Sequence, residues 1–236
     1  MPATTAHNGG RLMHKALAVI RTGGLSALAH ACARYIRARR EQWLESAIDR
    51  KYGIDTCGID DDLAALGAAG AHLAQARGYE AIQAPVFRAI LRAAAIDPRT
   101  YVFIDFGSGK GRALILAAER GFRRVIGIEL APALHEVAQR NSEAFRRQRP
   151  DAPPLELRCG DAVGLTIPDA DVLLFFCNPF GEGVMRKVAA NIERFHHRYA
   201  RKVVVAYRNP VHWPVFEEMA FLQPVVRNKS FAVYRS

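Results

Sequence analysis

Two carboxylates and a glycine-rich turn carry the clearest chemistry in this sequence. They lie in the stretch 101–130, which reads YVFIDFGSGKGRALILAAERGFRRVIGIEL. Asp105 ends one apolar run, and Glu129 ends the next. Three glycines follow Asp105 at alternate positions: Gly107, Gly109 and Gly111. Such a turn lets a ligand approach the backbone closely. Asp105 could receive a cationic amino group, and Glu129 could take both hydroxyls of a ribose, which suits a ligand with an ammonium and an adenosine.

The glycine spacing excludes two other nucleotide sites. A dinucleotide fingerprint, G-x-G-x-x-G, would need a third glycine where Arg112 stands. A phosphate-binding Walker loop is excluded because Lys110 is followed by Gly111 and because the opening glycine is missing. An NAD-dependent oxidoreductase is therefore disfavoured, and a ligand without a pyrophosphate is expected outside the carboxyl ends of the strands.

The order D-x-G-x-G-x-G followed by a strand-terminal Glu resembles the first motif of class I, seven-strand S-adenosylmethionine (SAM)-dependent methyltransferases. The resemblance covers roughly Tyr79 to the C terminus, and the FIDFGSGKGR turn is also similar to that of nucleosomal and mitochondrial lysine methyltransferases of the seven-strand type. A bacterial group of unassigned substrate shows loose similarity in the segment YGIDTCGIDDD. The resemblance implies SAM as cofactor. The implied cofactor-binding residues are Tyr79, Glu80, Asp105, Phe106, Gly107, Ser108, Gly109, Gly111, Glu129, Leu130, Gly160, Asp161 and Ala162.

The order of apolar runs predicts an α/β fold, a Rossmann-like seven-stranded sheet flanked by helices. Phe221–Arg227 and Ser230–Tyr234 are too close in sequence for a parallel crossover, so they predict an antiparallel hairpin. Pro224 cannot donate to a strand ladder, which places its strand at the sheet edge. These features match the family's strand order 3-2-1-4-5-7-6, with strand 7 antiparallel.

Two further segments are expected near the cofactor. The strand 155–159 ends at Gly160-Asp161, where the family usually places a polar group against the adenine amine; a simple turn aspartate is the alternative. Tyr79 and Glu80 precede the first strand, in a segment that often folds over the cofactor in class I enzymes. The alternative for these two residues is a helix-entry loop.

The acceptor side is expected at Asn178-Pro179-Phe180, after the apolar run Asp171–Cys177. Nitrogen-methylating relatives carry a similar tetrapeptide whose carbonyl groups accept hydrogen bonds from a target amine. Asn178 and Phe180 are therefore the candidate catalytic residues, although the second proline of that tetrapeptide is missing here, and an ordinary helix entry is the alternative. Tyr207 and Asn209, at the end of the next strand, are candidate substrate-binding residues.

Composition adds the following expectations. The 236 residues suffice for one α/β domain, 79–236, after an N-terminal helical extension, 1–78, with helices near 12–20 and 26–51. The start lacks signal-peptide features and no run suits a membrane span, so a cytoplasmic protein is expected. No metal site is predicted, because the four cysteines are far apart. The net charge of +10 could attract nucleic acid, anionic lipid or an acidic protein, but the Arg residues are scattered over several segments, which favours a solvated surface.

The sequence thus predicts methyl transfer from SAM to an acceptor that it does not identify. Nitrogen is slightly preferred and protein lysine is the favoured example. RNA, DNA and small molecules stay open as acceptors, as does the oligomeric state. A catalytically inactive SAM-binding partner subunit is the alternative from another class, since Asp105 and Glu129 argue for binding and not for turnover.

Overall fold

The computed structural model describes residues 33, 46–60, 66–68 and 70–236. The chain separates into two compact units, Met1–Ala47 and Ile48–Ser236, and the second is described below. The predicted helix at 12–20 and most of that at 26–51 lie outside the described residues. The division of the chain at residue 78 stays a prediction.

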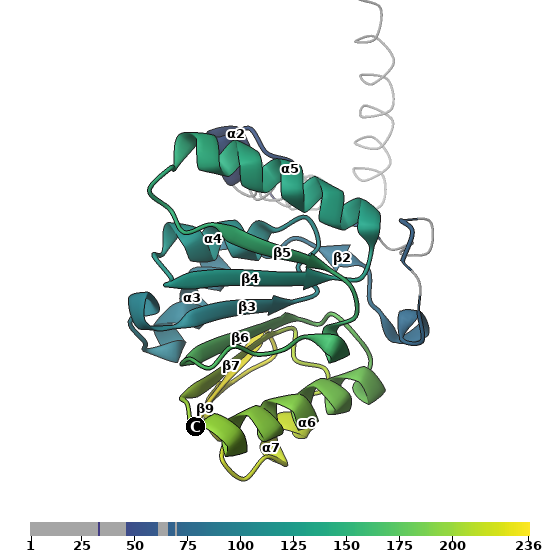
Figure 1. Ribbon diagram of the computed structural model, residues 1–236, viewed down its shortest axis with the longest axis vertical. Coiled ribbons are helices and arrows are strands. Elements are labelled where there is room, and N and C mark those ends of the chain that lie inside the picture. The colour runs from purple at the N-terminus through teal and green to yellow at the C-terminus, as the bar shows by residue number, and fades with distance from the viewer. Residues whose placement is uncertain (1–32, 34–45, 61–65, 69) are drawn as a thin grey trace, which may run out of the picture. The chain divides into compact units, whose positions relative to one another are not determined.

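A seven-stranded sheet forms the centre of this unit (Figure 1). Its order is β5-β4-β3-β6-β7-β9-β8, with β9 antiparallel to both of its neighbours. This confirms the predicted order 3-2-1-4-5-7-6. The strands are β3 (Val102–Phe106), β4 (Arg124–Glu129), β5 (Leu155–Cys159), β6 (Val172–Cys177), β7 (Val203–Arg208), β8 (Gln223–Arg227) and β9 (Phe231–Arg235).

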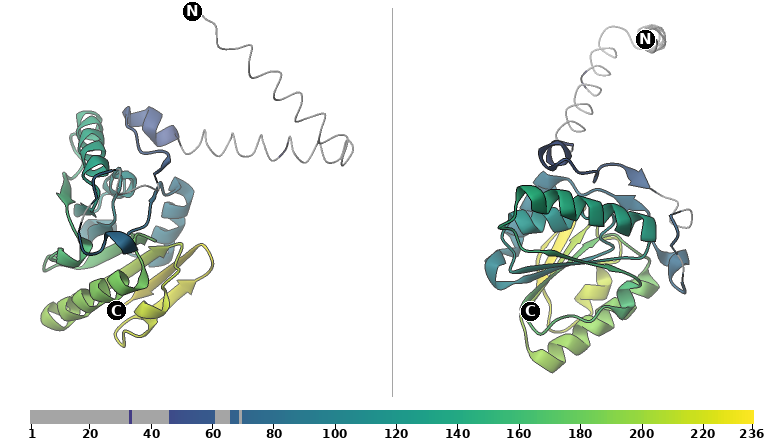
Figure 2. Two further views of the ribbon diagram at one scale, coloured as in Figure 1. Left: turned by 90° about the vertical axis from the view of Figure 1, so that its right-hand side faces the viewer. Right: turned by 45° about the horizontal axis from the view of Figure 1, so that its top comes forward.

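Helices cover both faces of the sheet (Figures 1 and 2). The helices are α2 (Ala47–Tyr52), α3 (Ala84–Ala94), α4 (Arg112–Glu119), α5 (Pro132–Gln148), α6 (Glu182–Tyr199) and α7 (Pro214–Glu217). Side chains of α2 to α5 pack on one face, and those of α6 and α7 pack on the other. Short 3₁₀ helices are η1 (Leu73–Gln75), η2 (Pro98–Thr100) and η3 (Ala162–Gly164). Among the described residues, none of these helices has the length and apolar character to cross a membrane.

The central strands are apolar on both faces because both faces are covered. Every residue of β3 is buried, including Asp105. Alternate residues serve opposite cores: Phe103 stacks on Phe175 under α3 and α4, whereas Phe106 stacks on Phe176 at 4.9 Å on the α6 side. The buried aromatic pairs fix the register of β3 against β6, and with it the level at which both strands end.

The C-terminal hairpin closes the sheet as predicted. The Asn228 side chain accepts hydrogen bonds from the backbone of Ser230 and Phe231, at 2.8 and 3.0 Å, and so holds the turn. β8 is the edge strand, and its register is irregular between Pro224 and Val226. The proline therefore sits where the missing N–H costs no ladder bond.

A buried arginine ties the residues before the sheet to the start of α4. The Arg112 side chain is 2% exposed. Its Nε donates to the Ile82 carbonyl at 2.8 Å, and one terminal nitrogen donates to Thr56 Oγ1 at 2.9 Å and contacts the Asp49 carboxylate at 3.3 Å. Asp49 also accepts from the backbone of Thr56 and Cys57. The residue that breaks the dinucleotide fingerprint is thus a structural cation.

We expect Arg112→Met to destabilise the fold by about 3 kcal/mol, because it leaves the Asp49 carboxylate without its buried partner. Arg124→Met is the matched control. Arg124 pairs with Glu156 at the partly exposed edge of the sheet, so its loss should cost about 1 kcal/mol or less. Urea unfolding of the wild type and both variants measures the difference. Equal losses in the two variants would contradict this reading.

Candidate functional site

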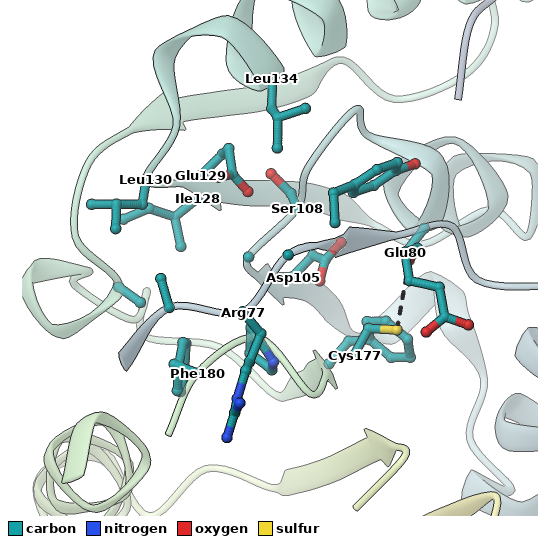
Figure 3. A pocket seen from close by; sticks show the side chains of 18 of the residues that line it. Arg77, Glu80, Asp105, Ser108, Ile128, Glu129, Leu130, Leu134, Cys177 and Phe180 are labelled. Carbon is teal, nitrogen blue, oxygen red and sulfur yellow. Dashed lines mark hydrogen bonds between the residues drawn. The ribbon is translucent and has the colours of Figure 1, made fainter. Parts of the chain in front are cut away.

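A pocket lies at the carboxyl ends of β3, β4 and β6, where the strand order reverses. Figure 3 shows Asp105 between the β4 residues Ile128 and Glu129 and the β6 residue Cys177. Residues 70–83, which we call the cover segment, contribute the lining opposite the strands. The members of the cover segment that line the pocket are His72, Ala76, Arg77, Gly78, Tyr79, Glu80 and Ile82.

The glycine turn between β3 and α4 is packed so tightly that side chains would not fit. A Cβ on Gly107 would come within 2.6 Å of Pro179, and one on Gly109 would come within 2.0 Å of the Tyr79 ring. Both glycines have positive φ, at 83° and 51°. The turn therefore holds the loop 178–180 against its first glycine and the cover segment against its second.

Asp105 is the most unusual group in the pocket. Its side chain is almost fully buried, and its Oδ1 is one of three buried side-chain atoms among the described residues that lack a hydrogen-bond partner. Burial, with a smaller contribution from the nearby Glu129 charge, raises the pKa of Asp105 well above its usual range. A cationic group that reached Asp105 would offset the cost of holding a charge in this buried position.

Glu129 is held by backbone donors. Its two oxygens accept from the N–H groups of Gly109 at 2.7 Å and Ala131 at 2.8 Å. Burial raises the pKa of Glu129, and these backbone hydrogen bonds oppose the rise. A carboxylate has about four acceptor positions, so these backbone donors do not use all of them. Glu129 thus links the glycine turn to the start of α5 and still faces the pocket.

The cover segment crosses the carboxyl edge of the sheet and is fastened on the β6 side. Arg77 N–H donates to the Pro179 carbonyl at 2.9 Å, and Gly181 N–H donates to the Gln75 carbonyl at 2.6 Å. The Gln75 side chain accepts from Val184 N–H in the first turn of α6. At the other end, Tyr79 donates its hydroxyl to the Thr56 carbonyl at 2.5 Å, within the region that Arg112 orders.

The cover segment leaves little space beneath it. The cavity measures about 70 Å³, whereas pockets for drug-sized ligands usually start at about 300 Å³. A nucleoside-sized ligand therefore needs more room than this space provides, and the pocket is partly open to solvent. The Tyr79 ring, which lies against Gly109, is the part nearest the glycine turn.

Asn178 begins the loop 178–180 in a left-handed conformation, with φ of 46°. The Tyr207 hydroxyl lies 3.4 Å from Asn178 Oδ1 and accepts from His212 N–H at 3.3 Å. Phe180 is 6% exposed and lines the pocket, as does Cys177. Burial raises the pKa of the Cys177 thiol to about 12, so it stays protonated at neutral pH.

Most of the predicted site residues come together. Those that line the pocket are Tyr79, Glu80, Asp105, Gly107, Ser108, Glu129, Leu130, Gly160, Asp161, Ala162 and Phe180. Five others lie beside it in different roles. Phe106 is in the core, Gly109 and Gly111 shape the turn, Asn178 enters the adjoining loop, and Tyr207 is fully buried behind Asn178. Asn209 lines a separate groove with Trp213 and Arg227.

Sequence reasoning did not single out His72, Gln75 or Arg77, which fasten or line the cover segment. The surrounding residues 64–77 are rich in alanine and carry no clear periodicity. Their contacts join positions about ninety residues apart or more, such as His72 with Asp161 and Gln75 with Val184. No local pattern in the sequence predicts such pairs.

A comparison with protein families adds an independent observation. Residues 103–202, from β3 to the end of the loop after α6, match the family model of a methyltransferase domain. The strand order, the glycine turn and both acids agree with that match. The domain is a class I, seven-strand methyltransferase. It uses S-adenosylmethionine as its methyl donor. A search of curated proteins found no significant sequence match to the chain.

Solved structures that resemble the methyltransferase include three with different stated substrates. An RNA methyltransferase from Salinibacter ruber, in complex with S-adenosyl-L-homocysteine, is 26% identical, with 64% of this chain and 88% of that chain covered and a TM-score of 0.42. A ribosomal protein L11 methylase from Lactobacillus delbrueckii subsp. bulgaricus is 12% identical, with 64% and 76% covered and a TM-score of 0.46. A geranyl diphosphate C-methyltransferase from Streptomyces coelicolor is 11% identical, with 65% and 77% covered and a TM-score of 0.46. With TM-scores below 0.5, these likenesses indicate no acceptor.

The pocket of the methyltransferase suits the charges of SAM. The amino group of SAM is cationic, and the buried Oδ1 of Asp105 has no other partner. The ribose offers two hydroxyl donors, and Glu129 keeps acceptor capacity beyond its backbone donors. The residues present therefore fit the ammonium and the ribose of the cofactor.

The ionisation of Asp105 gives a test by pH. Because the folded state raises its pKa above the unfolded value of about 3.9, this group favours folding most at low pH, and that contribution is lost as pH rises toward the folded-state pKa. We expect Asp105→Asn to be more stable than the wild type at pH 8, by about 1 kcal/mol or more, with the gap closing toward pH 4. Urea unfolding without cofactor between pH 4 and 8 measures this. Parallel pH profiles would refute the assignment.

Proposed function

We propose that this methyltransferase acts on a nitrogen atom, and that the acceptor is the side-chain amine of a protein lysine. The observation that carries the proposal is the loop Asn178-Pro179-Phe180, which sits against Gly107 at the edge of the pocket. Its similarity to the tetrapeptide of nitrogen-methylating enzymes supports nitrogen, and the similarity of the FIDFGSGKGR turn to lysine methyltransferases supports lysine.

The left-handed backbone of Asn178 directs a side-chain amide that could orient an acceptor amine. Tyr207 holds Asn178 Oδ1 from behind, so the carboxamide has a fixed direction. An amide oxygen accepts two hydrogen bonds and can orient an amine through its N–H groups. Positioning of this kind can supply roughly 7–11 kcal/mol of a reaction barrier. Asn209, with φ of 50° on the same sheet edge, is proposed to contact the acceptor outside the pocket.

The walls beside Asn178 suit the stem of a lysine. Phe180 and Cys177 are apolar surfaces in the lining. Their contact with an aliphatic stem would be favourable, and the protonated Cys177 thiol would not compete as a nucleophile. A lysine ammonium must lose a proton before its lone pair can react. The buried position lowers the pKa of an amine and so helps that loss.

The cofactor roles proposed here follow the same geometry. Bound SAM supplies an electrophilic methyl group on a sulfonium. Asp105 would bind its ammonium, Glu129 its ribose hydroxyls and Asp161 its adenine amine. The residues of the glycine turn, 106–111, together with Leu130, Gly160 and Ala162, would form the surface beneath it, and Tyr79 and Glu80 would cover it. Enclosure by the cover segment would exclude water from the acceptor.

The test is transfer of labelled methyl groups from SAM into a fractionated bacterial lysate, followed by amino-acid analysis of the protein fraction. We expect label on lysine nitrogen. Label confined to RNA, DNA or small molecules would overturn the lysine assignment, and label on oxygen or sulfur would overturn nitrogen. Clear S-adenosylhomocysteine binding without label in any fraction would instead favour an inactive partner subunit.

Asn178→Gly provides the matched variant, because glycine keeps the left-handed backbone and removes only the carboxamide. We expect kcat on the labelled acceptor to fall roughly tenfold to a hundredfold, as orientation of the amine is lost. Affinity for S-adenosylhomocysteine, measured by calorimetry, should change less than about threefold. An unchanged kcat would remove Asn178 from the acceptor site.

A further inference from the structure

Three polar side chains, two of them in the lining of the pocket, are joined by hydrogen bonds. His72 precedes η1 in the cover segment, Asp161 precedes η3, and Lys187 lies on α6. His72 Nδ1 lies 2.5 Å from Asp161 Oδ2, and its Nε2 lies 2.8 Å from Lys187 Nζ. Three elements that are distant in sequence therefore meet through one imidazole ring.

The chemistry of the three side chains determines which atom donates and which accepts in each hydrogen bond. A lysine ammonium can only donate, so His72 Nε2 must accept from Lys187. The remaining proton of the neutral ring is then on Nδ1, which donates to Asp161. Asp161 receives a second hydrogen bond on its other oxygen, Oδ1, from Val163 N–H at 2.9 Å. Each oxygen of Asp161 thus has one fixed donor.

The His72 side chain is more deeply buried than the Asp161 side chain to which it is bonded. The His72 side chain is 14% exposed, whereas that of Asp161 is 36% exposed. Both residues line the pocket. The imidazole is thus enclosed and held in place, while the carboxylate that it orients keeps open acceptor positions. The positive charge of Lys187, on the other side of the His72 ring, also offsets part of the negative charge of Asp161.

We infer that His72 is a positioning residue for adenine: it fixes the Asp161 carboxylate in the orientation that receives the adenine amine, and Lys187 sets the tautomer that makes this possible. The inference rests on the proposed role of Asp161 in the cofactor site. It assigns to the cover segment a part in choosing the nucleobase, in addition to enclosing the pocket.

A purely structural role for His72 would be to fasten the cover segment to α6. Gln75, three residues later, does this independently through its backbone carbonyl and side chain, which bind Gly181 and Val184 and do not contact Asp161. Gln75→Ala is therefore the matched control. It loosens the same segment from the same helix and leaves the carboxylate of Asp161 in place.

The readout is the ratio of two dissociation constants, those for S-inosylhomocysteine and S-adenosylhomocysteine, measured by calorimetry with the full chain. The two ligands differ in the group at position 6 of the base, a carbonyl oxygen in one and the amine in the other. A hydrogen bond to a charged group predicts a ratio of roughly 10 to 100 in the wild type. His72→Phe, which keeps a ring without either nitrogen, should lower the ratio at least about fivefold. His72→Asn, whose amide can donate to Asp161, should recover part of it, and Gln75→Ala should keep the wild-type ratio.

The possible outcomes distinguish a failure of the role of His72 from a failure of the proposed role of Asp161. If Asp161→Ala abolishes the preference and His72→Phe preserves it, His72 has no positioning role and the inference fails alone. If Asp161→Ala preserves the preference, Asp161 does not read the amine and its proposed cofactor role fails first. If Gln75→Ala lowers the ratio as much as His72→Phe does, the effect belongs to the cover segment as a whole and the inference is overturned.

Discussion

The structure depends on one electrostatic constraint, the burial of the Asp105 carboxyl group without a partner for Oδ1 at the end of the central strand. Removing a charged group from water is costly unless a partner offsets it. β3 cannot place this acid elsewhere, because Phe103 and Phe106 lock the strand between two aromatic cores. The fold thus holds a site whose carboxyl group is satisfied when a cation reaches it.

The other charged residues of the glycine turn bind other parts of the protein, and Asp105 faces the pocket. Arg112 donates hydrogen bonds to Ile82, Thr56 and Asp49, and Lys110 donates to the Cys57 carbonyl. Both cations are thus directed toward the residues before the sheet. The cover segment, held by Tyr79 at one end and by Gln75 at the other, then lies over a narrow pocket that is partly open to solvent.

The sequence predicted the parts of the fold that local patterns encode. Continuous apolar runs revealed the buried strands, and Pro224 with its short turn revealed the antiparallel hairpin at the edge. Asp105 and Glu129 were found because strand ends and glycine spacing place them in register. Pattern alone could not say which way the side chains at the end of β7 point: Tyr207 lies one residue before the end of that strand, yet its ring packs in the core and its hydroxyl contacts Asn178. Tyr79 and Glu80 were expected over the cofactor, but the part of the cover segment before Gly78 was beyond local reasoning, because its alanine-rich residues gain their positions from distant partners such as Asp161.

We infer that Asp105 receives the ammonium of the cofactor. A crystal structure of the full chain with S-adenosylhomocysteine tests it most directly, since this product keeps the amino group. The account predicts the amino nitrogen within about 3 Å of an Asp105 oxygen, directly or through one water, with both ribose hydroxyls on Glu129. An adenosyl ligand bound elsewhere, or one whose amino group is held by other residues while Asp105 stays unpaired, would contradict it.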